Sequence, residues 1–281
     1  MGKIMNNEIG IIGVGFVGGA LAKYFKKQRV KLFLYDKFKG LGTVSKVNQA
    51  DVVFVCVPTP YKPGRGFDIS AVEDALKILE GEKIVVIKSS ILPGETERLQ
   101  EKFPQHSLVF NPEFLRENFA YQDLIHPERQ LIGVTKKSQK VGKQVLGLLP
   151  KAGYAKIMPA NEAEMVKYMA NTFLALKVVF GNEFYGICQK SGIDYNKVRE
   201  AAAKDARIGD SHLDVIHGGY RGYGGSCFPK DVNAIIQLAE SKKIQVELLK
   251  SMRRINRGLL KASGFSEEYF LSGKHKKKKR I

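Results

Sequence analysis

The chain has 281 residues, of which 44% are hydrophobic and 26% charged, a globular composition that excludes wholesale disorder, collagen and coiled coil. The formal net charge is +18, from 46 basic and 28 acidic residues, and six of the positive charges lie in the last eight residues, so the rest of the chain is still at +12. A basic body attracts anions such as nucleotides, sugar nucleotides, nucleic acid or acidic lipid, and charge alone does not choose among them.

The sequence predicts neither a membrane span nor a secreted protein. Charged residues or glycines interrupt every apolar stretch before it reaches the 18 residues that a span needs. The polar segment Met1–Asn7 is too short for a secretory signal. Cys56, Cys188 and Cys227 are odd in number and lack metal-ligand spacing, so we expect reduced thiols, no metal site and a cytoplasmic location.

The first half of the chain alternates apolar runs with helical patterns, which is typical of parallel βαβ units in an open sheet. The second half is helical, apart from a glycine-rich stretch at 218–225. The predicted strands are Glu8–Val14, Lys31–Tyr35, Val52–Val57, Ile84–Lys88, Leu108–Phe110 and Gln130–Val134. The predicted helices are Phe16–Lys27, Ile69–Leu79, Glu95–Lys102, Gln139–Leu149, Asn161–Lys190, Tyr195–Lys204, Asp231–Ser241 and Val246–Lys261.

We therefore predict an α/β protein in which a Rossmann-type parallel sheet precedes an all-helical domain for substrate binding and dimerisation. The predicted boundaries are 1–158 for the first domain, 159–265 for the second, and 266–281 for a basic tail that we expect to be disordered.

Three glycines point to a dinucleotide site. Gly13, Gly15 and Gly18 have the G-x-G-x-x-G spacing, between a predicted strand and a predicted helix that begins with Phe16 and Val17. The glycines allow a tight turn, close approach to a pyrophosphate and close packing of helix on sheet. The free N–H groups of the helix N-terminus then face the phosphates.

Asp36 supports the choice of NAD. It ends the second predicted strand, 18 residues after Gly18. A carboxylate in this place hydrogen-bonds a ribose 2′-hydroxyl and repels a 2′-phosphate, which favours NAD over NADP, while Lys37 and Lys39 soften that preference.

Cys227 is a candidate nucleophile. It follows the glycine-rich stretch and immediately precedes a predicted helix, with Lys230 three residues further on. A helix N-terminus and a nearby amine both stabilise a thiolate. Cys56 and Cys188 lie in apolar surroundings and are expected to be ordinary buried residues.

The segment 221–231, RGYGGSCFPKD, resembles the active-site segment of the UDP-glucose/GDP-mannose dehydrogenase family. Further stretches match that family in the same order, so the resemblance runs from about Glu8 to about Leu260. They are 57–60 (VPTP), 88–94 (KSSILPG), 111–117 (NPEFLRE), 162–171 (EAEMVKYMAN) and 205–209 (DARIG).

The resemblance implies oxidation of a sugar nucleotide, with UDP-glucose ranked first and UDP-glucuronate as product. Converting the C6 alcohol into a carboxylate removes two hydrides, each taken by NAD. A cysteine that holds the aldehyde as a thiohemiacetal, and then the acid as a thioester, lets one site perform both steps.

The resemblance also implies site residues. Cys227 matches the nucleophile, Lys167 and Asn171 match the pair that stabilises oxyanion character, Asp231 matches a carboxylate that orients water, and Glu117 matches a base for thioester hydrolysis. Ser90 replaces the usual threonine but keeps the hydroxyl, for water or cofactor. Thr59 and Lys230 match cofactor contacts. Residues expected at the substrate are Glu113, Phe114, Leu115, Arg116, Lys167, Asn171, Arg207, His212, Tyr223 and Gly224.

One part of the resemblance fails, because family members continue into a second nucleotide-binding domain. The chain is therefore either a compact form or a fragment, and the sequence does not decide which base the substrate nucleotide carries. GDP-mannose or a UDP-N-acetyl sugar are alternative substrates.

Other functional hypotheses stay open. They are a two-electron hydroxyacid dehydrogenase, a non-catalytic binder of NAD or a sugar nucleotide, and a nucleic-acid binder using Lys274–Arg280, which no reading motif supports. We expect a homodimer, because Arg207 matches an arginine that reaches the neighbouring site. Met165, Met169, Phe173 and Leu176 form an apolar stripe at helical spacing, expected to be core or dimer packing.

Overall fold

The computed structural model describes residues 8–62 and 66–272, which divide into two compact units. Unit 1 comprises residues up to Pro60 together with Phe67–Lys167, and unit 2 comprises Tyr61–Gly66 and the chain from Tyr168 onward. The division falls inside one helix, α7 (Ala160–Lys190), so the helix begins in unit 1 and continues into unit 2. The predicted boundary, after residue 158, lay before this helix.

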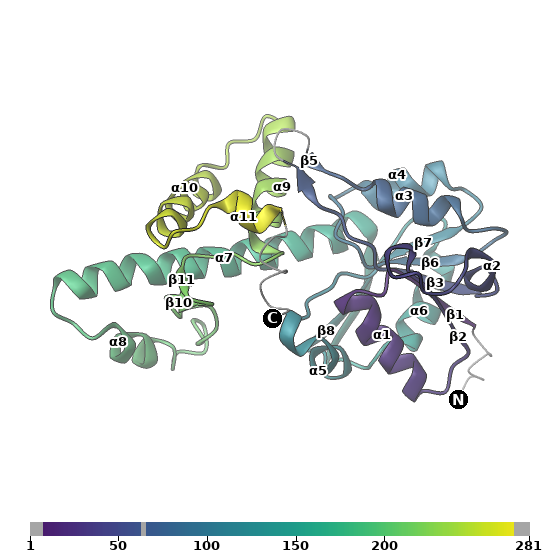
Figure 1. Cartoon of the computed structure of the whole chain (residues 1–281), viewed down its shortest axis with the longest axis horizontal. Coiled ribbons are helices and arrows are strands. Elements are labelled where there is room, and N and C mark those ends of the chain that lie inside the picture. Colours follow the sequence, from purple (N-terminus) through teal and green to yellow (C-terminus); the bar gives the residue numbers. More distant parts are fainter. Residues whose placement is uncertain (1–7, 63–65, 273–281) are drawn as a thin grey trace. The chain divides into compact units, whose positions relative to one another are not determined.

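Unit 1 contains a seven-stranded sheet with the strand order β2-β1-β3-β6-β7-β8-β9 (Figure 1). Strands β1, β2, β3, β6 and β7 run parallel in register, as the alternating sequence predicts. The strands are β1 (Ile9–Ile12), β2 (Leu32–Tyr35), β3 (Val52–Val55), β6 (Ile84–Ile87), β7 (Ser107–Phe110), β8 (Arg129–Val134) and β9 (Tyr154–Pro159).

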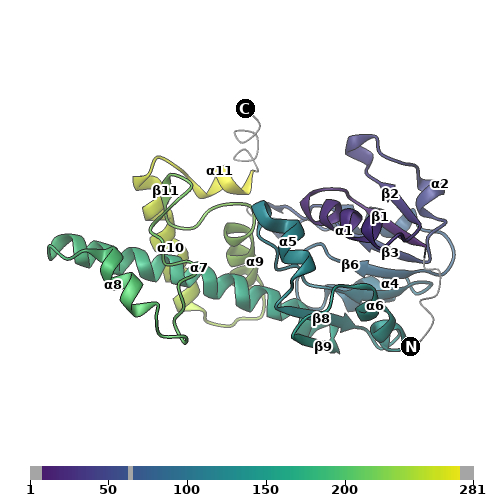
Figure 2. The same ribbon diagram turned by 90° about the horizontal axis from the view of Figure 1, so that it is seen from below.

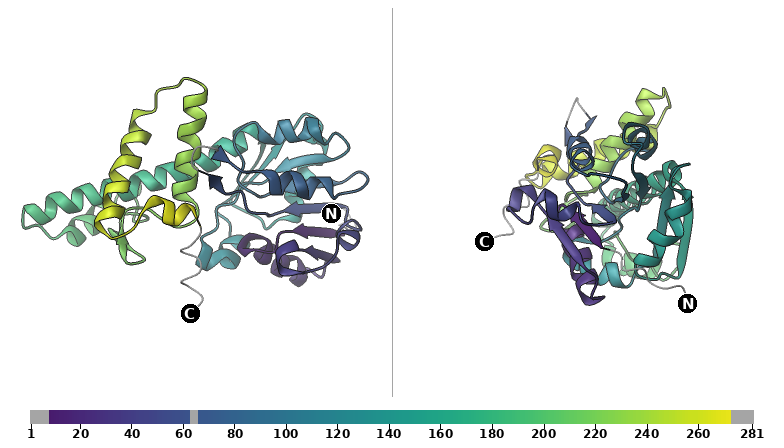
Figure 3. Two further views of the ribbon diagram at one scale, coloured as in Figure 1. Left: turned by 45° about the horizontal axis from the view of Figure 1, so that its top comes forward. Right: turned by 90° about the vertical axis from the view of Figure 1, so that its right-hand side faces the viewer.

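Helices cover both faces of this sheet, because its central strands are apolar on both sides. On one face, the core of buried side chains joins the strands to α2, α3, α4 and the start of α7. On the other face, a second core joins them to α1, α5 and α6 (Figure 3). These helices are α1 (Phe16–Lys27), α2 (Val44–Val47), α3 (Ser70–Lys77), α4 (Glu95–Lys102), α5 (Ala120–Ile125) and α6 (Gly142–Leu148).

Two features of the sheet differ from the prediction of parallel βαβ units. Strand β8 is antiparallel to β7. The connection between them contains the six-residue helix α5, and the chain enters β8 at the carboxyl end of β7. Strand β9, parallel to β8, was not predicted. Its exposed residues and terminal Pro159 hide a strand pattern, and both are tolerated at the edge of a sheet.

Unit 2 is mainly helical, with short two-stranded sheets in place of the all-helical domain expected. Its core joins α7 to the two long helices α9 and α10, and includes the buried Tyr223 (Figure 2). The remaining elements are β4 (Tyr61–Lys62), β5 (Gly66–Phe67, of which Phe67 counts with unit 1), α8 (Tyr195–Ala202), β10 (Ile216–His217), β11 (Tyr220–Arg221), α9 (Phe228–Ser241), α10 (Glu247–Ala262) and α11 (Glu267–Leu271).

Helix α11 corrects the prediction of a disordered tail from residue 266. The Ser266 side chain caps this helix by accepting a hydrogen bond from the Tyr269 N–H at 3.2 Å. Glu267 and Phe270 are buried, with 2% and 4% of their surfaces exposed. Residues 273–281, which hold the basic run, lie outside the described residues.

Candidate functional site

The turn between β1 and α1 has the geometry that a dinucleotide site requires. Gly13 has a φ of +87°, and a Cβ there would come within 2.8 Å of the Cys56 backbone. A Cβ at Gly18 would lie 2.0 Å from the Gly13 carbonyl oxygen. Gly15, by contrast, faces open space and begins α1 without a side-chain cap. The N–H groups of the first turn, which starts with Phe16 and Val17, are therefore available for a phosphate.

Asp36 closes this turn from the end of β2. Its Oδ2 accepts the Val14 N–H at 2.8 Å, and its Oδ1 accepts those of Phe38 and Lys39, each at 3.1 Å. A carboxylate has about four acceptor positions, so one remains for a ribose hydroxyl. The residues present thus fit an adenine dinucleotide. The Lys39 amine donates to the Val14 carbonyl at 2.5 Å, which fastens the same turn.

Thr59 and Ser90 lie together at the carboxyl ends of two adjacent strands, β3 and β6. The Thr59 hydroxyl donates to the Ser90 carbonyl oxygen at 2.6 Å. Thr59 is 6% exposed and Ser90 is half-buried. The carboxyl ends of parallel strands are where open α/β sheets bind ligands, which agrees with the cofactor contacts expected here.

A buried group of charged side chains lies at the same end of the sheet. The Lys167 amine donates to the Glu113 carbonyl oxygen at 2.8 Å, and the two residues are 3% and 8% exposed. Lys88, 6% exposed, donates to Asn111 Oδ1 at 2.6 Å. The Asn111 amide in turn donates to the Leu131 carbonyl oxygen of β8 at 2.8 Å.

Lys88 is a buried polar residue of this group that the sequence analysis did not single out. Burial lowers the pKa of its amine, and the charge of Lys167 lowers it further, while Cys56 and Glu113 act in the opposite direction. Burial also raises the pKa of Cys56 to about 12, so this thiol stays protonated. The sequence does contain a signal for it, a lysine directly after a four-residue apolar strand. Burying a charged amine in such a place costs free energy unless the amine has a hydrogen-bond partner.

The loop after Asn111 presents the remaining predicted residues of unit 1. The Leu115 N–H donates to the Glu113 carboxylate, and the Arg129 guanidinium covers the Phe114 ring at 3.9 Å. Arg116 is bound to Asp123 through side-chain contacts of 2.7 and 3.0 Å. Glu117 starts a 3-10 helix and is exposed. The structure therefore brings Glu113 to Lys167, whereas Arg116 is paired with a carboxylate of α5.

Unit 2 contains a second polar group, centred on Asp231. This carboxylate is fully buried, and it accepts from the Asn171 amide at 2.5 Å and the Lys230 amine at 2.6 Å. Cys227 immediately precedes α9, one turn before Asp231, whose N–H donates to the Cys227 carbonyl at 2.9 Å. The thiol is half-buried and lies 3.6 Å from the Ser226 hydroxyl. A thiol and an ion-paired carboxylate thus lie one turn apart at the start of α9, and an amide of α7 donates to the carboxylate.

The other predicted substrate residues of unit 2 differ in what they offer a ligand. His212 has a φ of +67°, and its ring lies 5.5 Å from the ring of Phe228, next to Cys227. Arg207 is exposed and paired with Asp205 at 2.6 Å. The Tyr223 side chain is 2% exposed within the core, so only its backbone could contact a ligand. Gly224 is half-buried.

The apolar stripe of α7 is mostly not core in this chain. Leu176 packs against the core of unit 2, but Met165, Met169 and Phe173 are 42%, 74% and 59% exposed. The stripe continues along the helix with the exposed residues Phe180, Phe184 and Ile187.

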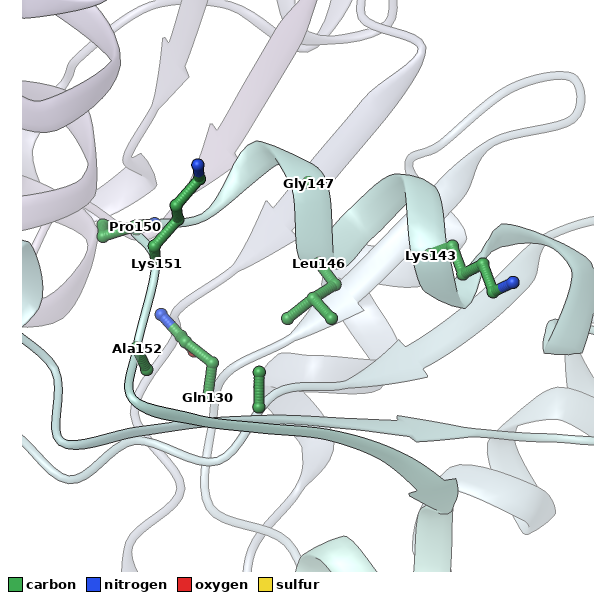
Figure 4. Close-up of a pocket in the computed structure, with 8 residues that line it drawn as sticks. Gln130, Lys143, Leu146, Gly147, Pro150, Lys151 and Ala152 are labelled. Carbon is green, nitrogen blue, oxygen red and sulfur yellow. The ribbon is translucent and has the colours of Figure 1, made fainter. Parts of the chain in front are cut away.

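A shallow pocket of about 430 Å³ lies elsewhere in unit 1, beside α6 and the start of β8. Its charged residues, Lys143 and Lys151, point away from each other (Figure 4). It therefore lacks converging polar groups, which a ligand site requires. Within residues 8–62 and 66–272, no group of three His, Cys, Asp or Glu side chains could hold a metal, and no helix is long and apolar enough to cross a membrane.

The sheet, the glycine turn and Asp36 define a Rossmann-type dinucleotide-binding protein. Residues 37–148 match the NAD binding domain of the UDP-glucose/GDP-mannose dehydrogenase family, and residues 161–258 match the central domain of that family. The chain therefore belongs to the UDP-glucose/GDP-mannose dehydrogenase family.

Named relatives agree with this assignment. The UDP-glucose 6-dehydrogenase of Rickettsia prowazekii is 35% identical over 218 residues, which cover 74% of this chain and 49% of that protein. The Bacillus subtilis UDP-glucose 6-dehydrogenase YwqF is 36% identical over 220 residues, with the same coverage. A UDP-glucose dehydrogenase structure from Pyrobaculum islandicum superimposes with a TM-score of 0.81 at 28% identity, over 91% of this chain and 69% of that one. The chain thus spans about half the length of these curated relatives.

Proposed function

We propose that the protein oxidises C6 of UDP-glucose to the carboxylate of UDP-glucuronate, with two NAD consumed. The observation that supports this most directly is the placement of Cys227. Its thiol lies at the N-terminus of α9, one turn before a buried carboxylate that Asn171 and Lys230 hold. A two-electron alcohol dehydrogenase has no need of a thiol in that place.

The thiol serves to retain the intermediate. When the C6 alcohol loses a hydride and a proton, it becomes an aldehyde. The Cys227 sulfur then adds to the aldehyde carbon and forms a thiohemiacetal, whose oxygen is protonated. Loss of a second hydride from that carbon, together with the hydroxyl proton, gives a thioester. Water then adds to the thioester carbon and the carbon–sulfur bond breaks, which releases the carboxylate and restores the thiol. NAD, when bound, supplies the hydride acceptor for both oxidations.

Other predicted site residues would manage charge and protons. Lys167 and Asn171 lie one turn apart on α7, and both are donors suited to the oxygen that becomes negative. Asp231, in an ion pair with Lys230, would orient a water and accept the alcohol proton. Glu117 would activate water for thioester hydrolysis, and Ser90 would orient water or the cofactor.

Further predicted residues would take part in substrate recognition. Glu113, Phe114, Leu115 and Arg116 would frame the sugar with the backbone of their loop, while His212 and Gly224 would contact it from the segments around Cys227. These residues do not decide the base, so GDP-mannose and UDP-N-acetyl sugars remain the next candidates.

The test is the amount of NADH formed per UDP-glucose consumed, with purified protein, excess NAD and the product identified by mass. Two NADH and UDP-glucuronate would support the proposal. One NADH would favour a two-electron dehydrogenase. Turnover only with GDP-mannose or a UDP-N-acetyl sugar would assign that sugar nucleotide as the substrate instead. Binding of NAD without any turnover would favour a non-catalytic binder.

We also propose that the protein forms a homodimer through the exposed stripe of α7. Exposed apolar patches of this kind in a folded protein usually belong to an interface. Arg207, exposed beside Asp205, would then reach the neighbouring subunit's substrate, where a guanidinium suits a pyrophosphate.

We propose a cytoplasmic location, because three free thiols suit a reducing compartment.

A further inference from the structure

Residues 263–271 lie beyond the stretch that matches the family's central domain, which ends at residue 258. They nevertheless pack against the glycine-rich loop that leads to Cys227, residues 221–227. Helix α11 contacts α9 and lies beside α10 in both Figure 2 and Figure 3. Glu267 and Phe270 are its two buried residues.

The first contact is between Phe270 and the backbone of the loop. A Cβ at Gly224 would come within 2.7 Å of the Phe270 ring and 2.5 Å of the Tyr220 hydroxyl. The loop backbone therefore lies directly against this aromatic pair, whose ring centroids are 5.0 Å apart. A side chain at position 224 could enter only if the rings moved.

The second contact is a set of hydrogen bonds to the loop backbone. Asn256 of α10 is fully buried; its Oδ1 accepts the Tyr223 N–H at 2.7 Å and its amide donates to the Tyr223 carbonyl at 3.0 Å. The Ser263 hydroxyl accepts the Arg221 N–H at 3.0 Å. These bonds satisfy loop groups that no sheet partner satisfies.

The third contact joins α11 to α10. Arg257 binds Glu267 Oε2 with two N–H groups, at 2.6 and 2.9 Å, and the Glu267 carboxylate is almost fully buried. Burial, and next the charge of Glu267, raises the pKa of the Tyr223 phenol, so this carboxylate also lies near the loop.

We propose that α11 is a brace for the catalytic loop: Phe270 packs on Gly224, the Glu267–Arg257 pair fixes α11 to α10, and together they position Cys227 at the start of α9. The residues of the brace are positioning residues, since they act through the loop. The packing of α11 on the loop does not depend on whether the protein oxidises UDP-glucose. Only the effect of this packing on turnover rests on the proposed function.

The experiment compares Phe270→Ala with Phe103→Ala. Phe103 is a buried phenylalanine of unit 1, 7% exposed, and its variant controls for a general loss of stability. Both are studied well below their unfolding temperatures, with folding verified by circular dichroism. Hydrogen exchange is measured for the amides of residues 221–227, and the alkylation rate of Cys227 by iodoacetamide is followed by peptide mass spectrometry.

We expect Phe270→Ala to speed exchange at Tyr223 by about tenfold or more and to change the Cys227 alkylation rate at least about threefold, as local opening of the loop implies. Phe103→Ala leaves both unchanged. Unchanged loop exchange in Phe270→Ala would overturn the brace. If that variant does not fold, Glu267→Gln and Gly224→Ala probe the same contacts from the helix and from the loop, and unaltered exchange in both overturns it equally.

Turnover separates the brace from the proposed function. If UDP-glucose is oxidised, Phe270→Ala lowers kcat relative to Phe103→Ala. If the unaltered protein oxidises no sugar nucleotide, the proposed function fails, while exchange and alkylation still decide the brace.

Discussion

The two units hold their polar site residues by different means. In unit 1, the amines of Lys88 and Lys167 are buried, and they donate to uncharged oxygens of Asn111 and Glu113 at the end of the sheet. In unit 2, a fully buried carboxylate accepts from a lysine and an amide, and the Cys227 thiol is half-buried. The first group lies at the end of parallel strands, whereas the second is held by side-chain bonds between α7 and α9. Single substitutions in the two units should therefore have different effects on activity, stability and association.

The largest effect is expected at the nucleophile of unit 2. Cys227→Ser should lower the rate of acid formation by about 10³-fold or more, since loss of a nucleophile removes the covalent route. The measurement is UDP-glucuronate formed per unit time. Cys188→Ala, which alters a buried thiol of the same unit, serves as the control and should retain activity. Full turnover by Cys227→Ser would remove the thiol from the reaction.

The next effect concerns a buried carboxylate of unit 1. Glu164 on α7 accepts hydrogen bonds from the Gly94 N–H at 2.6 Å and from the Thr96 N–H and hydroxyl at 2.9 and 2.5 Å. Burial raises its pKa to about 7, although these bonds oppose the shift. The folded state thus binds the proton more tightly than the unfolded state. Its contribution to stability is complete below the ordinary carboxyl pKa and is lost as the pH rises to about 7.

From pH 4.5 to 7 the free energy of unfolding should therefore fall by up to about 3 kcal/mol through this group. Urea unfolding at a series of pH values measures this slope. Glu164→Gln should flatten it, and Glu162→Gln, at an exposed position of the same helix, should not. Equal slopes in the Glu164→Gln and unaltered proteins would show that Glu164 does not titrate in this range.

The exposed stripe of α7 gives a smaller effect, on association. Phe180 and Phe184 lie with ring centroids 4.7 Å apart on the exposed face. Phe180→Glu should weaken a dimer by about 2 kcal/mol or more, as loss of a central aromatic does. Light scattering over a dilution series would then report monomer where the unaltered protein reports dimer. A monomeric unaltered protein that oxidises its substrate at full rate would count against the role proposed for Arg207.

The smallest effect tests the lysine that only the structure revealed. Lys88→Met frees Asn111 from β6, and kcat should fall about tenfold, equivalent to about 1.4 kcal/mol. Lys83 is the matched control, because it lies at the other end of the same strand and donates to the Asn48 carbonyl at 2.8 Å. Lys83→Met should leave kcat unchanged. Equal rates in both variants would reduce Lys88 to a structural role.

Much of unit 1 could be predicted, because its signals are local. The strand, glycine turn and helix at 9–27 and the carboxylate at Asp36 are neighbours in the sequence. The placement of Cys227 before α9, and the one-turn spacing of Lys167 and Asn171, followed from helical periodicity. The antiparallel β8 and the edge strand β9 did not follow, because pairing direction depends on where a connection can go, which no short pattern records.

The sequence by itself determined the fold class, the cofactor turn and the family, and it predicts which residues could react. Tertiary structure alone decided the partners of those residues. Asn171 meets Asp231 across 60 positions, Lys88 meets Asn111 across 23, and Phe270 reaches Gly224 from a segment expected to be disordered. The physical reason is that turns and helix periods arise from neighbours in the chain. Burial, by contrast, is a property of the folded core, and it is burial that obliges each polar group to find a partner.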